Sequence, residues 1–180
     1  MSTALQQKQT SSTNIVQLSG NTIEDSQQYL TFMLATEVFA INILNIKEII
    51  EYGHLTEVPR MPGFIRGVIN LRGAVVPVID LGVRFGKQPT SVSRRTCVVI
   101  IEIEHEDEQQ VVGVMVDAVN EVMDILPDQI EPAPNFGANI RADFIAGMGK
   151  VEGKFVIILN VGHVLSLDEM ATLAAASDTV

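Results

Sequence analysis

Apolar and polar side chains alternate along most of this chain, and the alternation predicts a protein built of short β-strands. The apolar residues of Tyr29–Leu34 fall on one face of a strand, and Val38–Ile43 continues the pattern after a short turn. The spacing within Ile46–Tyr52 suits either a strand or a short helix. Because the surrounding sequence is rich in strand patterns, a strand is favoured there.

The stretch Gly63–Leu81 predicts a β-hairpin. Two apolar runs of β-forming residues flank the tight connection Asn70–Gly73. Pro77 lies in the second run and has no N–H to donate to a neighbouring strand. The second strand is therefore expected at an edge of its sheet, or with this position facing outward, so that it has a free side.

The pattern predicts further strands downstream. They are Thr96–Ile103, Val111–Asp117 and Ala118–Ile125, and a charged, exposed turn separates the first two. One helical turn is expected over Gly82–Lys87, and the prolines of Leu126–Asn139 indicate an irregular connector. Ser166–Glu169 has the spacing of an N-terminal capping box, which predicts a C-terminal helix through about Ala176.

The hairpin sequence occurs twice in the chain. Phe64–Phe85, the first copy, aligns without a gap with Phe144–Leu165, the second copy, 80 positions later, and three glycines coincide. Upstream of the two copies, Val38–Ile49 resembles Val111–Val122. This duplication predicts two similar small β units rather than an array of repeats. The glycines recur, as expected where both units need the same backbone geometry.

The two copies differ at the tip of the hairpin. Arg72 in the first copy becomes Glu152 in the second, whereas Glu48 upstream is kept as Glu121. A residue needed only for folding should appear in both copies, so Arg72 is a candidate for a role outside folding. Its guanidinium can bind a carboxylate through two parallel hydrogen bonds, and that carboxylate is either a partner's acid or Glu48. The alternative is an ordinary surface ion pair without functional consequence.

Composition narrows the class of protein. The 180 residues are 47% hydrophobic, which indicates a folded protein, and residues 1–26 are polar without periodicity, which indicates a flexible tail. A net charge of −10 argues against nucleic acid and anionic membranes as partners. There is one cysteine, no signal-peptide pattern, and no apolar run near the ~20 residues of a membrane span. A cytoplasmic protein without direct membrane insertion is expected.

No arrangement of residues predicts catalysis or a cofactor. His54, His105 and His163 lie in separate segments without cysteine or carboxylate at metal-ligand spacing, so no metal site is expected. Cys97 lies in an apolar strand with no base beside it, and the glycines complete no phosphate-binding motif. An enzyme needs a nucleophile, an acid or base, or a held metal. An interaction module is therefore favoured over an enzyme.

From about Tyr29 onward the chain resembles the CheW family of bacterial chemotaxis coupling proteins. The resemblance is carried by Ile41–Ile49, by Gly63–Leu81 with its Asn-Leu-Arg-Gly turn and VVPVIDL run, by Val111–Val122, by Glu131–Pro134 and by Phe144–Val161. It implies a mainly β fold of two five-stranded SH3-like β-barrels with short helices and a C-terminal helix. The expected organisation is a tail over 1–26, a CheW-like domain over 27–170 and a C-terminal helix and tail over 166–180. Within the domain, a first barrel is expected over about 27–88 and a second over about 95–165.

The resemblance also implies a function and partners. A non-catalytic adaptor is expected, which couples chemoreceptors (methyl-accepting chemotaxis proteins) to the histidine kinase CheA. The kinase would bind through its regulatory domain and the receptor through its cytoplasmic hairpin tip, so that the protein is recruited to membrane-associated receptor arrays. The alternatives are a coupling protein of a non-flagellar chemosensory pathway and a small β-barrel enzyme with a hidden site.

Two sets of site residues follow. The resemblance assigns receptor binding to a groove between the barrels; its residues are Ile43, Ile46, Glu48, Arg72, Cys97 and Val98. Burial in the core is the alternative for Ile43, Cys97 and Val98, since each lies in an apolar strand. Kinase binding is expected at an apolar patch beside a proline-rich loop; its residues are Val58, Met61 and Phe64. The repeat of Phe64 at Phe144 favours a core position for Phe64.

Overall fold

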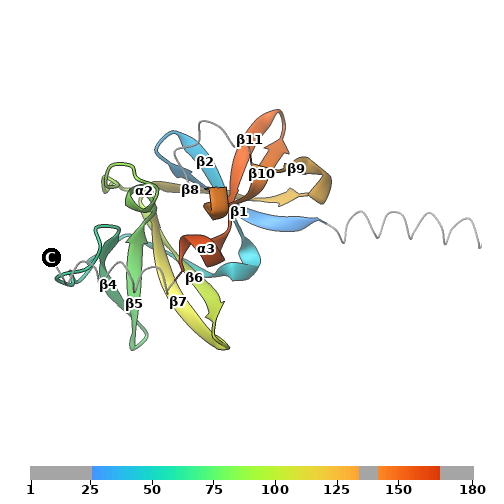
Figure 1. Ribbon diagram of the computed structural model, residues 1–180. Coiled ribbons are helices and arrows are strands. Elements are labelled where there is room, and N and C mark those ends of the chain that lie inside the picture. Colours follow the sequence, from blue (N-terminus) through green and yellow to red (C-terminus); the bar gives the residue numbers. More distant parts are fainter. Residues whose placement is uncertain (1–25, 134–141, 167–180) are drawn as a thin grey trace, which may run out of the picture.

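The computed structural model describes residues 26–133 and 142–166, and these residues are mainly β (Figure 1). The strands are β1 Gln27–Leu34, β2 Glu37–Asn42, β3 Ile46–Glu51, β4 Ile65–Leu71, β5 Ala74–Asp80, β6 Cys97–His105, β7 Glu108–Val116, β8 Ala118–Ile125, β9 Ile130–Glu131, β10 Ile145–Val151 and β11 Lys154–Leu159. The short helices are η1 Ile43–Asn45, α2 Leu81–Arg84, η2 Pro127–Gln129, η3 Ala142–Phe144 and α3 Val161–Val164. The strand favoured over Ile46–Tyr52 is confirmed as β3. The C-terminal helix predicted from Ser166 onward lies outside the described residues, apart from Ser166 itself.

The strands form two sheets. The A sheet has the order β8-β1-β2-β11-β10-β9, and the B sheet has the order β3-β6-β7-β5-β4. In both sheets neighbouring strands are antiparallel except at one place: β2 runs parallel to β11 in the A sheet, and β7 runs parallel to β5 in the B sheet. The two sheets therefore repeat one strand arrangement, as the sequence duplication predicts.

Each sheet closes on itself through one chain segment. After β3, Thr56 forms an antiparallel bridge with Val68 of β4, with N···O distances of 2.9 and 2.8 Å in the two directions. After β8, the chain forms β9, in which Glu131 pairs with Met148 of β10. In each sheet, the segment that follows one edge strand pairs with a strand at the opposite edge, and this pairing closes the sheet into a small barrel. The predicted mainly β fold with two duplicated barrels is confirmed.

Glycine makes this closure possible at the same place in both barrels. A Cβ atom at Gly67 would lie 2.5 Å from the carbonyl oxygen of Thr56. One at Gly147, the equivalent in the second copy, would lie 2.6 Å from Cγ2 of Ile130 and 3.1 Å from the carbonyl oxygen of Glu131. Only a residue without a side chain lets the closing segment approach this closely. The repeated glycine of the sequence therefore reflects backbone geometry.

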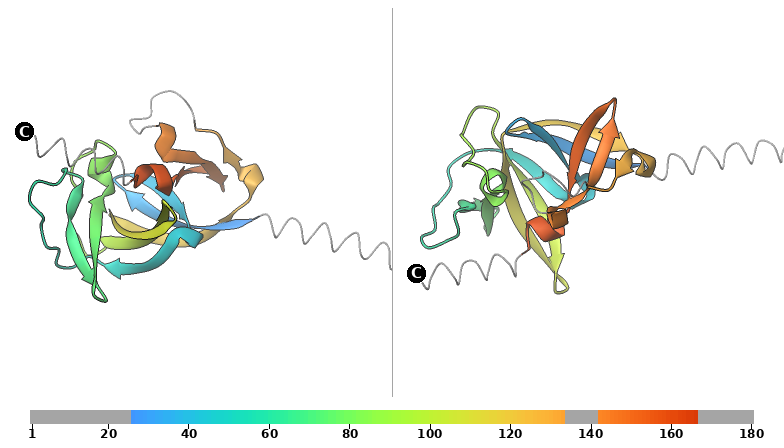
Figure 2. Two further views of the ribbon diagram at one scale, coloured as in Figure 1. Left: turned by 60° about the horizontal axis from the view of Figure 1, so that its bottom comes forward. Right: turned by 45° about the horizontal axis from the view of Figure 1, so that its top comes forward.

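The sheets do not divide the chain into residues 27–88 and 95–165. The first hairpin of each half lies in the sheet of the other half: β1 and β2 pair with β8 and β11, while β6 and β7 pair with β3 and β5. The predicted barrel boundaries are therefore wrong, because sequence similarity shows which segments are repeated and not which strands pair. Figure 2 shows the two sheets lying against each other, with α3 between them.

Of the two alternatives predicted for β5, the edge position is wrong. β5 lies between β7 and β4, so it is an interior strand. Its pairing with β7 begins only at Val78, and Pro77 pairs with Val68 on the β4 side alone. The missing N–H of Pro77 thus falls just outside the β7 ladder, where no hydrogen bond is lost.

In the described part of the chain, the alternation of side chains gives three apolar cores. The central core takes residues from both sheets, and it includes Phe32 and Phe39 from the A sheet with Val99 and Ile101 from the B sheet. Smaller cores fill the A barrel, around Ile158, and the B barrel, around Val98, Ile100 and Met115. Adjacent residues of a strand therefore face different cores.

Four phenylalanine rings cross the central core. The successive ring centroids of Phe32, Phe39, Phe85 and Phe144 are 6.0, 5.6 and 5.9 Å apart. Phe85 follows α2, whereas Phe32 and Phe39 belong to the A sheet. Burying a large apolar side chain contributes about 2 kcal/mol to folding, so these rings hold the two sheets together strongly.

Candidate functional site

Arg72 lies at the tip of the β4–β5 hairpin, in a two-residue turn. The backbone φ angles of Arg72 and Gly73 are 51° and 88°, and the Asn70 side chain accepts a hydrogen bond from the Gly73 N–H at 2.9 Å. Two successive residues with positive φ are the mark of a type I′ turn, whose twist matches that of the flanking strands. Glycine and asparagine favour this backbone conformation, and arginine does not.

The guanidinium of Arg72 makes a bidentate ion pair with Glu48 of β3. Nη1 and Nη2 donate to Oε1 and Oε2 of Glu48, each at 2.9 Å. These hydrogen bonds, together with the negative charge of Glu48, raise the pKa of Arg72. The Arg72 side chain is 71% exposed and that of Glu48 only 24%. Glu48 therefore fixes one edge of the guanidinium while much of the side chain stays open to a partner.

The second copy has the same turn without the ion pair. Glu152 and Gly153 have φ angles of 53° and 77°, close to those of Arg72 and Gly73. Glu121 takes the place of Glu48 in the repeat, so both positions of the second copy are acidic. The hairpin therefore folds without the arginine and without the ion pair, and the pair in the first copy needs an explanation other than the turn.

The residues predicted from sequence to bind the receptor lie on two different faces of the B sheet. Glu48 and Ile50 pair with Ile100 and Val98 of β6, which face the core of the B barrel. Ile49 pairs with Val99, which faces the central core, and Glu51 pairs with Cys97 on that same face. The structure therefore brings Glu48 together with Arg72 at the closure of the B barrel. It places Ile43, Ile46 and Cys97 elsewhere, half-buried at the margin of the central core.

Two apolar residues beside this margin are strongly exposed and were missed from the sequence. Leu44 in η1 is 86% exposed, and Ile49 in β3 is 42% exposed. Both lie within Ile43–Ile50, a stretch that also contains Asn45, Lys47 and Glu48, and each of its isoleucines and its leucine suits a core position. The alternation along β3 gives the signal that identifies Ile49, because Ile50 packs against the B-barrel core and the residue before it must face the other side.

Two predicted contact residues are buried. Val98 is 1% exposed, because it belongs to the core of the B barrel, and its side chain does not line a surface groove. Phe64 is 8% exposed and belongs to the central core, as its repeat at Phe144 indicated. Neither side chain is available for a partner. Val58 and Met61 are 38% and 37% exposed, so the loop before β4 presents apolar surface.

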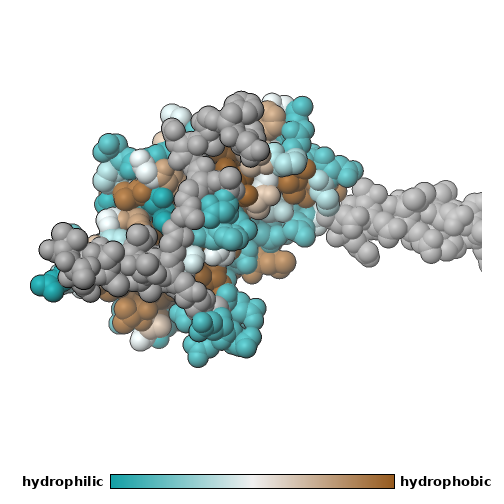
Figure 3. Space-filling view, in the orientation of Figure 1, coloured by the Kyte–Doolittle hydropathy of each residue, from teal (hydrophilic) through white to brown (hydrophobic). Residues whose placement is uncertain are grey.

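The loop that carries Val58 borders a surface hollow of about 730 Å³. Its lining is more polar than apolar and includes Tyr52, His54, Val58 and Arg66. On the other side of the same barrel, β5 exposes Val75 next to the Arg72 turn, and apolar surface is visible over the β4–β5 hairpin (Figure 3). The B barrel thus presents both apolar and charged surface to the outside.

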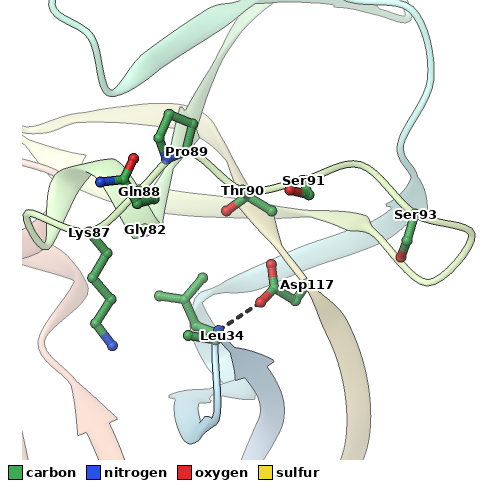
Figure 4. Close-up of a pocket in the computed structure, with 10 residues that line it drawn as sticks. Leu34, Gly82, Lys87, Gln88, Pro89, Thr90, Ser91, Ser93 and Asp117 are labelled. Carbon is green, nitrogen blue, oxygen red and sulfur yellow. Dashed lines mark hydrogen bonds between the residues drawn. The ribbon is translucent and has the colours of Figure 1, made fainter.

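A second hollow lies at the seam between the sheets. It has a volume of about 480 Å³, and its lining includes Leu34, Lys87, Thr90 and Asp117 (Figure 4). Asp117 accepts a hydrogen bond from the N–H of Ala35 at 2.7 Å. Serine and threonine hydroxyls line the hollow, and the hydroxyl of Thr90 donates a hydrogen bond to the carboxylate of Asp80 at 2.8 Å.

A buried carboxylate holds the segment that lines this hollow. Asp80 is fully buried and accepts hydrogen bonds from the N–H of Gly82, the N–H and hydroxyl of Thr90, and Nη1 of Arg66, at 2.8 to 3.2 Å. Four donors around one buried carboxylate compensate for its loss of hydration. Asp80 thereby anchors the irregular segment after α2 to the end of β5.

The described residues provide neither a metal site nor a membrane helix. Within residues 26–133 and 142–166, no three side chains of histidine, cysteine, aspartate or glutamate come together as metal ligands. In the same part of the chain, no helix is both long and apolar enough to cross a bilayer. What the surface offers is exposed apolar side chains beside an oriented arginine.

Comparison with known proteins gives consistent matches over most of the chain. The family model for the CheW-like domain matches residues 28–169. The chemotaxis protein CheW of Klebsiella aerogenes is 36% identical over 157 residues, which cover 87% of this chain and 91% of that protein. The chemotaxis protein CheW of Helicobacter pylori is 33% identical, over 83% of this chain and 90% of that protein. The crystal structure of the scaffolding protein TtCheW from Thermoanaerobacter tengcongensis superposes with a TM-score of 0.69 at 36% identity, over 77% of this chain and 86% of that one.

Proposed function

The chain belongs to the CheW family of chemotaxis coupling proteins, and from this premise we propose that it is a non-catalytic scaffold. It holds the cytoplasmic hairpin tip of a chemoreceptor and the regulatory domain of a CheA-type histidine kinase in one complex. The observation that supports this most is the exposed Arg72, which Glu48 orients through two hydrogen bonds and which the duplicated turn does not need. The protein works at the cytoplasmic side of receptor arrays without inserting into the membrane.

We propose that the receptor lies along the margin of the central core. Ile43, Ile46 and Cys97 are half-buried there, and Leu44 and Ile49 add exposed apolar surface. An amphipathic helix binds by placing its apolar face against such a surface, while polar contacts at the rim set its register. Arg72 and Glu48 would supply the polar contact from the B barrel.

Arg72 suits this task better than lysine would. Two of its donors are occupied by Glu48, which fixes the plane of the guanidinium, and the remaining donors can bind a carboxylate on the receptor. Because the side chain is held before the receptor arrives, less conformational entropy is lost on binding. The Glu48 pair is then a means of orientation and not only a surface contact.

We propose that the kinase binds the B barrel at the loop before β4. Val58 and Met61 are partly exposed there, beside the hollow that His54 and Arg66 line. Apolar side chains at the centre of an interface carry most of its binding energy. Charged substitutions such as Met61→Glu should weaken kinase binding by about tenfold or more and leave folding unchanged. Val92→Glu, at a more exposed loop residue, should not weaken it.

Pull-down of a receptor hairpin fragment and of the kinase regulatory domain tests the scaffold proposal. The full chain should bring down each of them alone and both together. Capture of the receptor fragment and the kinase domain only when both are mixed with the chain would also support scaffolding. Absence of binding to both partners would contradict it.

A further inference from the structure

Arg84 contacts both halves of the molecule at once. It lies in α2, half-buried, and its guanidinium carbon is 5.0 Å from the ring centroid of Phe64 and 4.7 Å from that of Phe144. Its Nε also donates a hydrogen bond to the carbonyl oxygen of Val164 at 3.0 Å. Phe64 precedes β4 of the B sheet, whereas Phe144 and Val164 flank the β10–β11 hairpin of the A sheet.

The duplication shows where this residue lies in the molecule. Phe64 and Phe144 are equivalent residues of the two copies, and so are Arg84 and Val164. A side chain that contacts two equivalent rings and its own equivalent residue lies at the axis that relates the two copies. Two arginines could not both occupy that position without repulsion between like charges. The copies therefore have to differ here, and the second carries valine.

The contact matters because the two sheets share no strand. Among the described residues, strand pairing occurs within the A sheet and within the B sheet, and not between them. The sheets meet through the apolar side chains of the central core, whose attraction has no preferred direction. A hydrogen bond and two stacked rings do have a preferred direction. Arg84 thus adds directional contacts between the sheets, alongside the ion pair of Lys87 with Glu37 at 3.6 Å and the hydrogen bond from the Asp117 N–H to the carbonyl oxygen of Met33 at 3.1 Å.

We propose that Arg84 is a positioning residue that fixes the orientation of the A sheet relative to the B sheet. A partner that contacts both sheets, as the proposed receptor groove requires, then meets a preset geometry. This second statement rests on the proposed function, whereas the orientation itself does not. Arg84 would then affect binding of the partner without contacting it.

Residual dipolar couplings of backbone N–H groups test the orientation directly. In the wild-type protein, the couplings of both sheets should fit one alignment tensor with the sheets oriented as in the structure. Arg84→Met keeps the length and apolar character of the side chain but removes the charge and the N–H donor. Arg84→Lys keeps a charge near the rings and removes the Nε donor. Arg94→Met, at an exposed arginine of the neighbouring segment, is the control.

The expected result is a changed relative orientation in Arg84→Met, a smaller change in Arg84→Lys, and none in Arg94→Met. Chemical shifts inside each barrel should stay close to wild type, because the barrel cores are untouched. Receptor-fragment affinity should fall at least about fivefold in Arg84→Met. An unchanged orientation in Arg84→Met, or in Arg84→Lys if the methionine variant does not fold, would overturn the proposal. Failure of the wild-type chain to bind receptor would contradict only the proposed function.

Discussion

At the scale of the residue, the two hairpin tips accept a backbone conformation that their side chains disfavour. Glu152 has a φ of 53° in a turn where asparagine followed by glycine is preferred. Glu152→Asn should therefore raise the free energy of unfolding by about 0.5 to 1 kcal/mol, since asparagine enters the left-handed region more easily. Urea unfolding followed by circular dichroism measures this. A destabilised variant would show that the Glu152 side chain contributes more than its backbone strain costs.

The raised pKa of Tyr29 should make the stability of the protein depend on pH. Burial raises the pKa of Tyr29 above the usual 10.0, and a hydrogen bond with Asn42 opposes this in part. The folded protein therefore retains the proton at a pH where the unfolded chain has lost it. Stability is unaffected below pH about 10 and falls as the pH rises through the folded value.

Tyr29→Phe keeps the buried ring and removes the ionisable group, so it should reduce the loss of stability above pH about 10. The chain contains two tyrosines, so the phenolate absorbance of Tyr52→Phe reports Tyr29 alone. That absorbance should rise at a higher pH in the folded protein than in urea. Titration at the same pH in both states would contradict the assignment.

The site residues differ in how far they could be predicted from sequence. Arg72 was identified because its equivalent is Glu152, and Glu48 was one of its two possible partners. Val98 was misplaced because β6 is apolar at successive positions. The strand β6 faces a core on each side, and the sequence does not show which faces of a strand are covered. Leu44 was missed because an apolar residue at 86% exposure has no sequence signature of its own.

At the scale of the element, Asp80 joins the end of β5 to the segment after α2. Thr90→Val removes one hydroxyl donor to Asp80 and keeps the side-chain volume, so the free energy of unfolding should fall by about 1 to 2 kcal/mol. Asp80→Asn should cost more, about 3 kcal/mol, because the buried charge that accepts four donors is lost. Ser91→Ala, on the exposed neighbour, is the control. Thermal and urea unfolding would measure all three, and equal stability of Thr90→Val and Ser91→Ala would exclude the anchoring role.

The strands themselves were largely predictable, whereas the sheet they form was not. The apolar positions of β1, Leu30, Phe32 and Leu34, all face the central core, as their alternation indicated. Pro77 illustrates the opposite case. It predicted either an edge strand or a position whose N–H would face away from a partner, and the second alternative holds, because the neighbouring ladder has not yet begun at Pro77. Where a ladder begins depends on tertiary pairing that local sequence does not contain.

At the scale of the whole molecule, the exchange of hairpins between the two sheets predicts that neither half folds alone. Fragments 1–91 and 92–180 each lack partners for their first hairpin, because β1 and β2 pair with β8 and β11. Each fragment should give a poorly dispersed ¹H–¹⁵N spectrum by itself. Mixed in equal amounts, they should reproduce the spectrum of the intact chain. A well-dispersed spectrum from either fragment alone would contradict the exchanged topology.

The duplication could be predicted from sequence, and the exchange could not. The 80-residue offset showed two equivalent hairpins, and both the exchanged and the unexchanged arrangement give the same local pattern of strands. They are distinguished by the strand pairings that join the two halves, which are β1 with β8, β2 with β11, β3 with β6 and β5 with β7. The exchange also means that the central core cannot form from one half of the chain.

Receptor-stimulated kinase activity of Arg72→Asn beside Glu152→Asn tests the central claim most directly. The two variants place the same residue at equivalent turns with nearly the same φ, so their effects on the backbone match. If Arg72 couples receptor to kinase, Arg72→Asn should fold normally and lose most of the stimulation, and Glu152→Asn should retain it. Equal activity in both variants, whether normal or lost, would contradict a coupling role for Arg72.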